Sequence, residues 1–119
     1  MSARVQVRRI YDPAEPGDGY RVLVDRVWPR GLAKAKAEMD EWCREIAPTA
    51  ELRKWYSHDP EKYAEFRDRY LVELADPDHA QALAALKKHV KSGLTLLTAT
   101  RSAELSQAHV LAEYLERLA

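Results

Sequence analysis

The segment Tyr20–Gly31, YRVLVDRVWPRG, constrains the fold of this chain more than any other stretch. It opens with the apolar, partly β-branched run Val22–Val24, which is typical of a strand buried on both faces. It then becomes charged, because Asp25, Arg26 and Arg30 surround a Val-Trp-Pro run and a glycine follows. A buried strand that ends in charges and a Pro/Gly break is how an open α/β sheet presents a site at its carboxyl edge. The segment therefore predicts where a site lies, without specifying its chemistry.

A second buried strand is expected at Leu94–Ala99, which reads LTLLTA. Thr100, Arg101 and Ser102 follow at its carboxyl end. A half-apolar alternation over residues 5–8 predicts a further strand at a sheet edge. If the two buried strands are parallel neighbours, the polar residues that follow each of them meet at one edge of the sheet.

Helical segments separate and follow these strands, each marked by a capping residue or proline and by an apolar stripe at helical spacing. They are expected at about Thr49–Tyr56, Asp59–Leu74, Asp78–Lys91 and Ala103–Leu118. This alternation predicts a single three-layer α/β domain over residues 1–119, with a mainly parallel sheet and helices on both faces. The inward positions predict a core that includes Val22, Val24, Ile46, Leu52, Phe66, Tyr70, Leu83, Leu86, Leu94, Leu96, Leu97, Leu111 and Leu115.

The segment around residues 40–46 is compatible with two structures. Met39, Trp42, Cys43 and Ile46 recur at helical spacing, which favours a helix. A strand over about Asp40–Ile46 is the alternative, and the family resemblance given below favours it. A short helical turn is expected just before it, in the Ala/Lys-rich stretch 32–38.

Composition excludes several classes of protein. Apolar residues make up 46% and charged residues 32% of the 119 residues, as in a globular domain. No apolar run approaches the roughly 20 residues that cross a bilayer, so no membrane association is expected. No apolar signal core follows the charged N-terminus, and a single cysteine fits a reducing compartment, which together predict a cytoplasmic protein. Lys+Arg and Asp+Glu both number 19, and this balance argues against binding of duplex DNA.

The predicted edge of the sheet is rich in groups that bind anions. The guanidinium groups of Arg26, Arg30 and Arg101 would converge there, with one counter-charge from Asp25. Asp25 is also a candidate base, although it could equally cap the turn or pair with a local arginine. His58 is a candidate acid–base group if it faces the strand ends, or a loop residue that bonds a carbonyl. The full set of candidate ligand-binding residues is Arg26, Trp28, Arg30, Lys54, Thr100, Arg101 and Ser102.

Metal and cofactor chemistry is not indicated by the remaining candidates. His79, His89 and His109 fall on expected helices with no second ligand at metal spacing. Cys43 has no neighbouring residue in the sequence that could act as a base for its thiol, so we expect it to be a small buried residue. The glycines of the stretch 17–19 precede a strand, whereas a dinucleotide fingerprint must open a helix. No metal and no cofactor is therefore expected.

Several motifs together resemble a known family. VLVDRVWPRG, then IAPTAELRKWYSHDPEKYAEFRDRYLVEL, then GLTLLTATR with AHVLAEYL are similar to the YeaO-like branch of the domain-of-unknown-function 488 (DUF488) family. The resemblance runs from about Arg21 to Leu115. It implies a compact α/β domain of bacterial or archaeal origin with no established activity. It also implies a short strand just ahead of Thr49, which favours the strand over Asp40–Ile46.

The chain departs from this family pattern after its last strand. Relatives often carry an acidic residue near Ser102 and His or Asn residues near Leu105 and Ser106, where this chain has none. Any family role of polar groups in that loop is therefore in question for this protein.

Two functions of different classes are consistent with these residues. The first is a domain that binds a small anionic ligand, namely a nucleotide, phosphate ester or carboxylate, at the carboxyl ends of the strands. The alternative is a non-catalytic interaction protein whose Arg/Trp loop binds a protein or single-stranded nucleic acid. A concave pocket at the strand ends favours the first, and a flat, exposed Trp/Arg surface favours the second.

Overall fold

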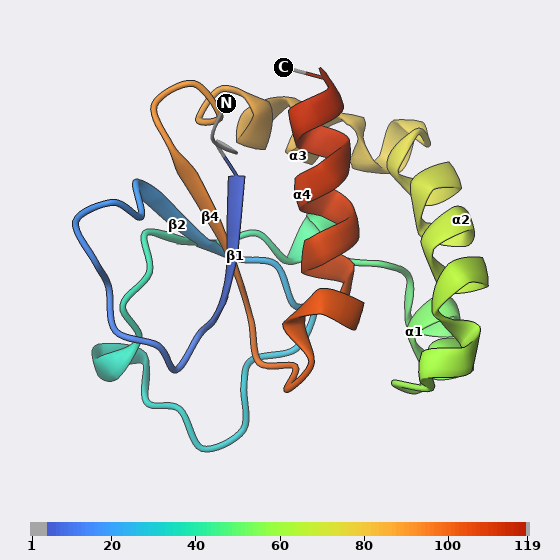
Figure 1. Cartoon of the computed structure of the whole chain (residues 1–119), viewed down its shortest axis with the longest axis horizontal. Helices are drawn as coiled ribbons and strands as arrows, with labels where there is room; N and C mark the ends of the chain where they lie inside the picture. The colour runs from blue at the N-terminus through green and yellow to red at the C-terminus, as the bar shows by residue number, and fades with distance from the viewer. Residues whose placement is uncertain (1–4, 119) are drawn as a thin grey trace.

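The computed structural model describes residues 5–118, which form a sheet with helices packed on one face (Figure 1). The strands are β1 (Val5–Arg9), β2 (Tyr20–Leu23), β3 (Glu41–Trp42) and β4 (Leu94–Thr98). The α-helices are α1 (Ala50–Tyr56), α2 (Tyr63–Leu74), α3 (Pro77–Lys87) and α4 (Gln107–Leu118). Short 3₁₀ helices are η1 (Lys34–Lys36), η2 (Arg44–Ile46), η3 (Pro60–Lys62) and η4 (Ala103–Leu105).

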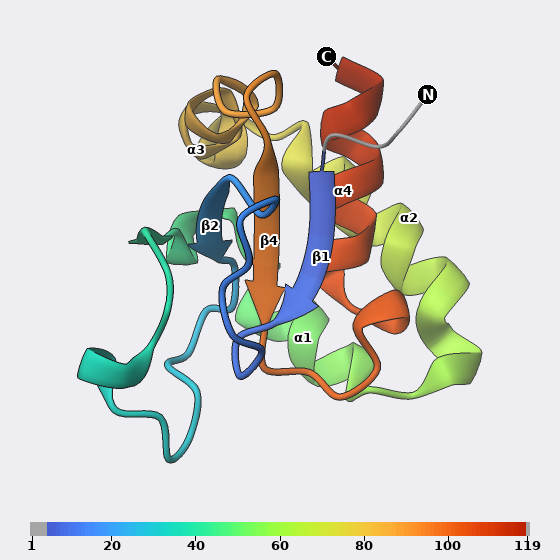
Figure 2. The ribbon, with the colours of Figure 1, turned by 60° about the vertical axis from the view of Figure 1, so that its left-hand side comes forward.

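The sheet has the strand order β1-β4-β2-β3, and every pairing is parallel. Val22 lies opposite Leu96 and Leu23 opposite Leu97, so the two strands expected to be buried are central neighbours. Figure 2 shows the arrowheads of β1, β2 and β4 pointing in the same direction. The predicted parallel sheet, with β1 at an edge, is therefore confirmed, and the segments after β2 and β4 leave the sheet side by side.

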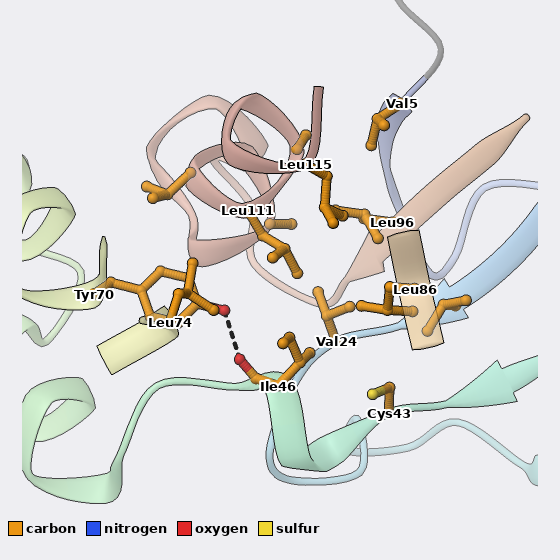
Figure 3. Packing of buried hydrophobic residues seen from close by; sticks show 14 of the residues in the cluster. Val5, Val24, Cys43, Ile46, Tyr70, Leu74, Leu86, Leu96, Leu111 and Leu115 are labelled. Atoms are coloured by element: carbon orange, nitrogen blue, oxygen red, sulfur yellow. Dashed lines mark hydrogen bonds between the residues drawn. The ribbon is translucent and has the colours of Figure 1, made fainter. Parts of the chain in front are cut away.

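One face of the sheet is covered by all four α-helices. Val22, Val24, Leu94 and Leu96 from the strands share one buried apolar cluster with residues of the helices. Figure 3 shows this packing and the hydrogen bond that the Tyr70 hydroxyl donates to the Ile46 carbonyl oxygen over 2.6 Å. Every predicted core residue is buried except Leu83, which is partly buried against the same cluster.

The opposite face is covered by the two loops 10–19 and 24–40, the second of which includes η1. Ile10, Leu23 and Leu97 are buried there against partly buried apolar residues, namely Trp28, Leu32, Met39, Trp42 and Ala99. The three-layer α/β class is confirmed, but no α-helix of the described residues lies in this layer. The segment between β2 and β3 contains a Pro/Gly break and an exposed Ala/Lys run, which give an α-helix no apolar stripe with which to pack.

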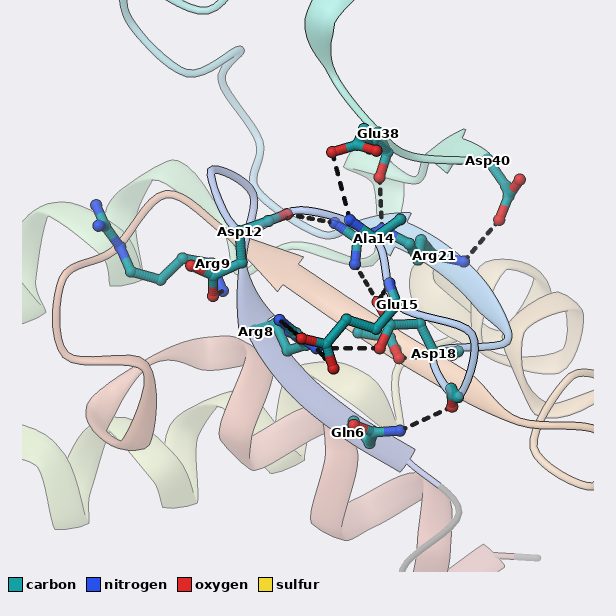
Figure 4. Close-up of polar contacts among 12 residues, drawn as sticks. Gln6, Arg8, Arg9, Asp12, Ala14, Glu15, Asp18, Arg21, Glu38 and Asp40 are labelled. Carbon is teal, nitrogen blue, oxygen red and sulfur yellow. Dashed lines mark hydrogen bonds and ion pairs between the residues drawn. The ribbon is translucent and has the colours of Figure 1, made fainter.

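A cluster of largely buried charged side chains holds the loop 10–19 against this second face (Figure 4). The Asp18 carboxylate pairs with the guanidinium of Arg21 on β2, and its second oxygen lies 3.2 Å from Arg8 Nη1 on β1. The Thr95 hydroxyl of β4 donates to the Asp18 carbonyl oxygen over 2.6 Å. Burial alone would raise the pKa of Asp18, but the Glu15 N–H and the two arginines outweigh it, so the pKa is lowered. One loop residue thus contacts three neighbouring strands.

The segment whose structure the sequence left open divides into two elements. Glu41 and Trp42 pair with β2 as the short strand β3, and η2 follows at Arg44–Ile46. The expected strand is therefore present but ends earlier than Ile46. The strand is short because the Cys43 N–H, which bonds to the Leu23 carbonyl oxygen over 2.8 Å, is followed by the tight turn of η2.

Capping residues mark the starts of several helices. The Thr49 hydroxyl accepts a hydrogen bond from Leu52 N–H at the start of α1, and it donates to the Glu73 carboxylate of α2 over 2.7 Å. Asp59 caps η3 rather than α2, and Asp76 caps α3, which starts at a proline. Over residues 5–118 none of the helices combines the length and apolarity that a bilayer crossing requires.

Candidate functional site

A cavity of about 230 Å³ opens where β2 and β4 end. Asp25 and Arg26 line it from the segment after β2, Thr100 from the segment after β4, and Arg53 from α1. Phe66 of α2 also lines it. We call this the Arg53 cavity. It lies at the sheet edge that the sequence predicted.

A second cavity of about 380 Å³ adjoins the first and has four lining residues in common with it: Tyr56, His58, Ala99 and Thr100. Arg101 and Ser102 line only this second hollow, which we call the Arg101 cavity. Together the two cavities reach the size of a small-molecule site, roughly 300–1,000 Å³.

Asp25 is half-buried and bonds to several segments that meet at this edge. One carboxylate oxygen accepts hydrogen bonds from the Thr98 hydroxyl over 2.8 Å and from Gln107 Nε2 over 2.6 Å. The other accepts from the Ala99 N–H over 2.8 Å. Burial raises the pKa of Asp25, and these three hydrogen bonds and the nearby His58 offset that effect only in part. The carboxylate therefore joins the end of β2 to the end of β4 and to the start of α4.

Arg26 is held by backbone carbonyl groups and not by a carboxylate. Its Nε donates to the Pro48 carbonyl oxygen over 3.0 Å, and its Nη2 donates to the Ala47 carbonyl oxygen over 3.2 Å. The Ala47 oxygen also lies 3.2 Å from Nε2 of the buried His79. These two hydrogen bonds fix the guanidinium beside the chain that leads into α1.

The rim shared by the two cavities is formed by a turn in an unusual backbone conformation. Ser57 ends α1 at φ 45°, and His58 follows at φ 58°, so two successive non-glycine residues are left-handed. Each such residue costs roughly 1–2 kcal/mol. The turn places His58 beside both cavities, with its ring centroid 6.3 Å from that of Tyr56. Burial raises the pKa of Tyr56, whose hydroxyl donates to the Leu105 carbonyl oxygen over 2.6 Å.

Comparison with known proteins gives a family. Residues 4–119 match the family model described as "Inactive DUF488-N3 subclade". The chain belongs to the DUF488 family. The uncharacterized protein YeaO of Escherichia coli (strain K12) is 46% identical over 115 residues, which cover 96% of this chain and 98% of YeaO. The uncharacterized protein Rv3073c of Mycobacterium tuberculosis (strain ATCC 25618 / H37Rv) is 48% identical over 113 residues, 94% of this chain and 93% of that protein. No solved structure gives a significant match.

In this DUF488 protein, six of the candidate residues from the sequence line the two cavities. Asp25 and Arg26 line the Arg53 cavity, Arg101 and Ser102 the Arg101 cavity, and Thr100 and His58 line both. The expected approach of the segments after β2 and β4 is thus observed. Asp25 takes the structural role that the sequence left open, because its oxygens hold the strand ends together.

Three other candidates lie away from the cavities. Trp28 packs edge-on against Trp42 with ring centroids 5.2 Å apart, and its Nε1 donates to the Leu32 carbonyl oxygen over 2.7 Å. It belongs to the layer of loops on the second face of the sheet. Arg30 and Lys54 are exposed and line neither cavity. Of the three arginines expected to converge, Arg26 and Arg101 line the two adjoining cavities, one each, whereas Arg30 lines neither.

Arg53 and Gln107 are site residues that reasoning from the sequence did not select. Arg53 is exposed, and no described residue bonds or pairs with its guanidinium. A helical projection contained the signal, since Arg53 borders the face formed by Leu52 and Tyr56, whereas Lys54 points to the opposite side. Gln107 gave no local signal, because its partner Asp25 lies far away in the sequence.

The chemistry available at these cavities is that of an anion site. Among the lining residues of the two cavities, all within the described chain, Asp25 contributes the one carboxylate. The same lining includes three arginines, an imidazole and several hydroxyl groups. No group of three or more His, Cys, Asp or Glu side chains within residues 5–118 is placed to hold a metal ion. Cys43 is buried, and burial raises the pKa of its thiol to about 11, so it is a poor nucleophile.

Proposed function

We propose that this DUF488 protein is a non-catalytic domain that binds a small anionic ligand at the carboxyl ends of β2 and β4. The ligand class is a phosphate ester, a nucleotide or a carboxylate. The observation that carries the proposal is the charge of the lining: the two cavities have three arginines, Arg26, Arg53 and Arg101, and one carboxylate. That carboxylate, Asp25, is half-buried and already accepts three hydrogen bonds. Such a site has an excess of donors and positive charge, which suits an incoming anion.

Two further observations support binding without catalysis. The oxygens of Asp25 are occupied by Thr98, Ala99 and Gln107, so the carboxylate has little capacity left to accept a substrate proton. The family model that the chain matches is also described as an inactive subclade. His58 is then a ligand contact instead of an acid–base group.

Calorimetric titration with inorganic phosphate, adenosine monophosphate and acetate tests the proposal. Binding of at least one of them is expected at millimolar concentration or below, with a matching rise in the melting temperature. The variant Arg53→Gln should weaken it by about tenfold or more, because it removes a charge-assisted hydrogen bond of roughly 1.5–3 kcal/mol. Arg30→Gln makes the same change of charge on an exposed residue outside the cavities and serves as the matched control.

The proposal fails if none of the three anions binds. It also fails if Arg53→Gln and Arg30→Gln weaken binding equally, since the effect would then reflect net charge and not the cavity. The interaction protein with an Arg/Trp loop remains an alternative, but the described structure gives it no support. The Trp28 ring packs on Trp42, and its N–H is already bonded within the loop.

A further inference from the structure

The two cavities at the strand ends adjoin through four shared lining residues, and each has an exposed arginine that the other lacks. Arg53 lines only the first cavity and Arg101 only the second. Both side chains are exposed, and no described residue forms a hydrogen bond or ion pair with either guanidinium. Each cavity therefore presents guanidinium donors that can receive an anionic group directly.

The four lining residues that the cavities share form a common wall between them. Ala99 and the Tyr56 ring give it an apolar surface, while Thr100 and His58 add one hydroxyl and one imidazole. Tyr56 is fixed there by its stacking on Phe66, with ring centroids 4.1 Å apart, and by its hydrogen bond to Leu105. No acidic side chain of the described residues lies in this shared wall. A carbon spacer can therefore cross it and contact Ala99 and Tyr56 without desolvating a carboxylate.

The position of His58 agrees with a ligand that passes from one cavity to the other. The two left-handed residues that end α1 hold the imidazole at the junction. Backbone strain of this kind persists where the surrounding structure maintains it, and it is concentrated at ligand sites. His58 makes no described hydrogen bond, so its ring can donate to or accept from a polar atom of the spacer.

We propose that the ligand is a linear dianion, with one anionic group bound by Arg53 and the other by Arg101, and with its spacer lying over Ala99 and Tyr56 beside His58. This inference rests on the anion site proposed above and specifies its ligand. Two weak anion contacts joined by a spacer of the right length bind more tightly than either alone, because the second contact forms within the complex. A spacer that is too short cannot reach both guanidiniums, so affinity should depend on length.

The test is a calorimetric comparison of linear dicarboxylates, malonate to pimelate, with the monocarboxylates of equal carbon number. Affinity should pass through a maximum with length, and the best dicarboxylate should bind about tenfold or more tightly than its monocarboxylate. Arg53→Gln and Arg101→Gln should each abolish this advantage, whereas Arg30→Gln, which is exposed and outside the site, should preserve it. Equal melting temperatures of the three variants without ligand show that each is folded.

The outcomes separate this inference from the proposed function. If monocarboxylates or phosphate bind through Arg53 but dicarboxylates bind no more tightly, the anion site stands and the dianion is excluded. If the advantage of the dicarboxylate survives Arg101→Gln, the second contact lies elsewhere and the inference is wrong. If no anion binds, both fail together. A length optimum that requires both arginines supports the inference.

Discussion

Replacement of Asp25 tests whether the sheet edge is held together as described. In Asp25→Ala, three donors lose their acceptor: the Thr98 hydroxyl, Gln107 Nε2 and the Ala99 N–H. The Thr98 hydroxyl can turn to Thr100 Oγ1, which lies 3.2 Å away, and the Gln107 amide lines the Arg53 cavity, where water can reach it. The Ala99 N–H is part of the backbone, so it cannot rotate toward another acceptor.

The expected loss of stability in Asp25→Ala depends on which of these donors can find another partner. A donor left without a partner costs about 1–3 kcal/mol, and hydrogen bonds to a charged group contribute about 1.5–3 kcal/mol each. Part of this loss is recovered, because the substitution also removes a carboxylate whose burial is unfavourable. We therefore expect Asp25→Ala to lower the free energy of unfolding by about 2–3 kcal/mol. Asp25→Asn should cost less, since its amide oxygen can still accept from Ala99.

The same residue predicts a dependence of stability on pH. Burial raises the folded-state pKa of Asp25 above its unfolded value, near 3.9. The folded protein then holds the proton more tightly than the unfolded chain, so the stabilisation is complete below the unfolded pKa and is lost as the pH rises through the folded pKa. The difference in unfolding free energy between wild type and Asp25→Asn should therefore fall as the pH rises above about 4.

Urea denaturation followed by circular dichroism, at a series of pH values, measures both quantities. Asp25→Asn is the matched control, because it keeps the shape of the side chain and removes its titration. If the wild-type advantage over Asp25→Asn grows with pH, the carboxylate is a favourable charge and the described balance between burial and hydrogen bonding is wrong. If Asp25→Ala costs nothing, the strand ends are held together by other contacts.

Two further predictions concern the frame around the site. An added Cβ at Gly19, which has φ 68°, would lie 2.3 Å from the Gly93 carbonyl oxygen, whereas one at Gly31, with φ 78°, meets nothing within 4 Å. In urea denaturation Gly31→Ala should cost about 1–2 kcal/mol for the left-handed backbone alone, and Gly19→Ala clearly more; equal losses would contradict this contact. Phe66→Ala removes a ring that is 2% exposed and stacked on Tyr56, so it should cost about 3–5 kcal/mol, and a loss below 1 kcal/mol would show that the site does not depend on it.

The central strands could be predicted because their signal is local. Apolar residues dominate Val22–Val24 and Leu94–Leu97, which is typical of strands buried on both faces. The helical segments between them imply parallel pairing, as observed. The second face could not be predicted in the same way. Arg21 sits next to the buried run and is itself buried, because Asp18 from the preceding loop neutralises it, and no periodicity records such a pairing.

The site illustrates the same limit at the level of single residues. The sequence indicates that Asp25 and Arg101 approach each other, because both follow central strands, and the structure shows both at the cavities. It does not indicate how far the loop after β2 stays at that edge. Arg30 leaves it because the Pro/Gly break turns the chain toward the second face, where Trp28 packs. Arg53 of α1 lines the cavity instead. Its position next to the apolar face of that helix follows from the helical repeat of the sequence.

The described contacts divide the residues of the site into two groups with different expected behaviour. Asp25 and Arg26 bond to the backbone of other segments, so their replacement should appear mainly as lost stability. Arg53 and Arg101 are exposed and make no described bond, so their replacement should appear mainly as lost affinity. The fixed group positions the strand ends, and the free group supplies the charges that a ligand would meet. Binding and folding can therefore be perturbed separately, which allows the anion site to be tested independently of the stability of the fold.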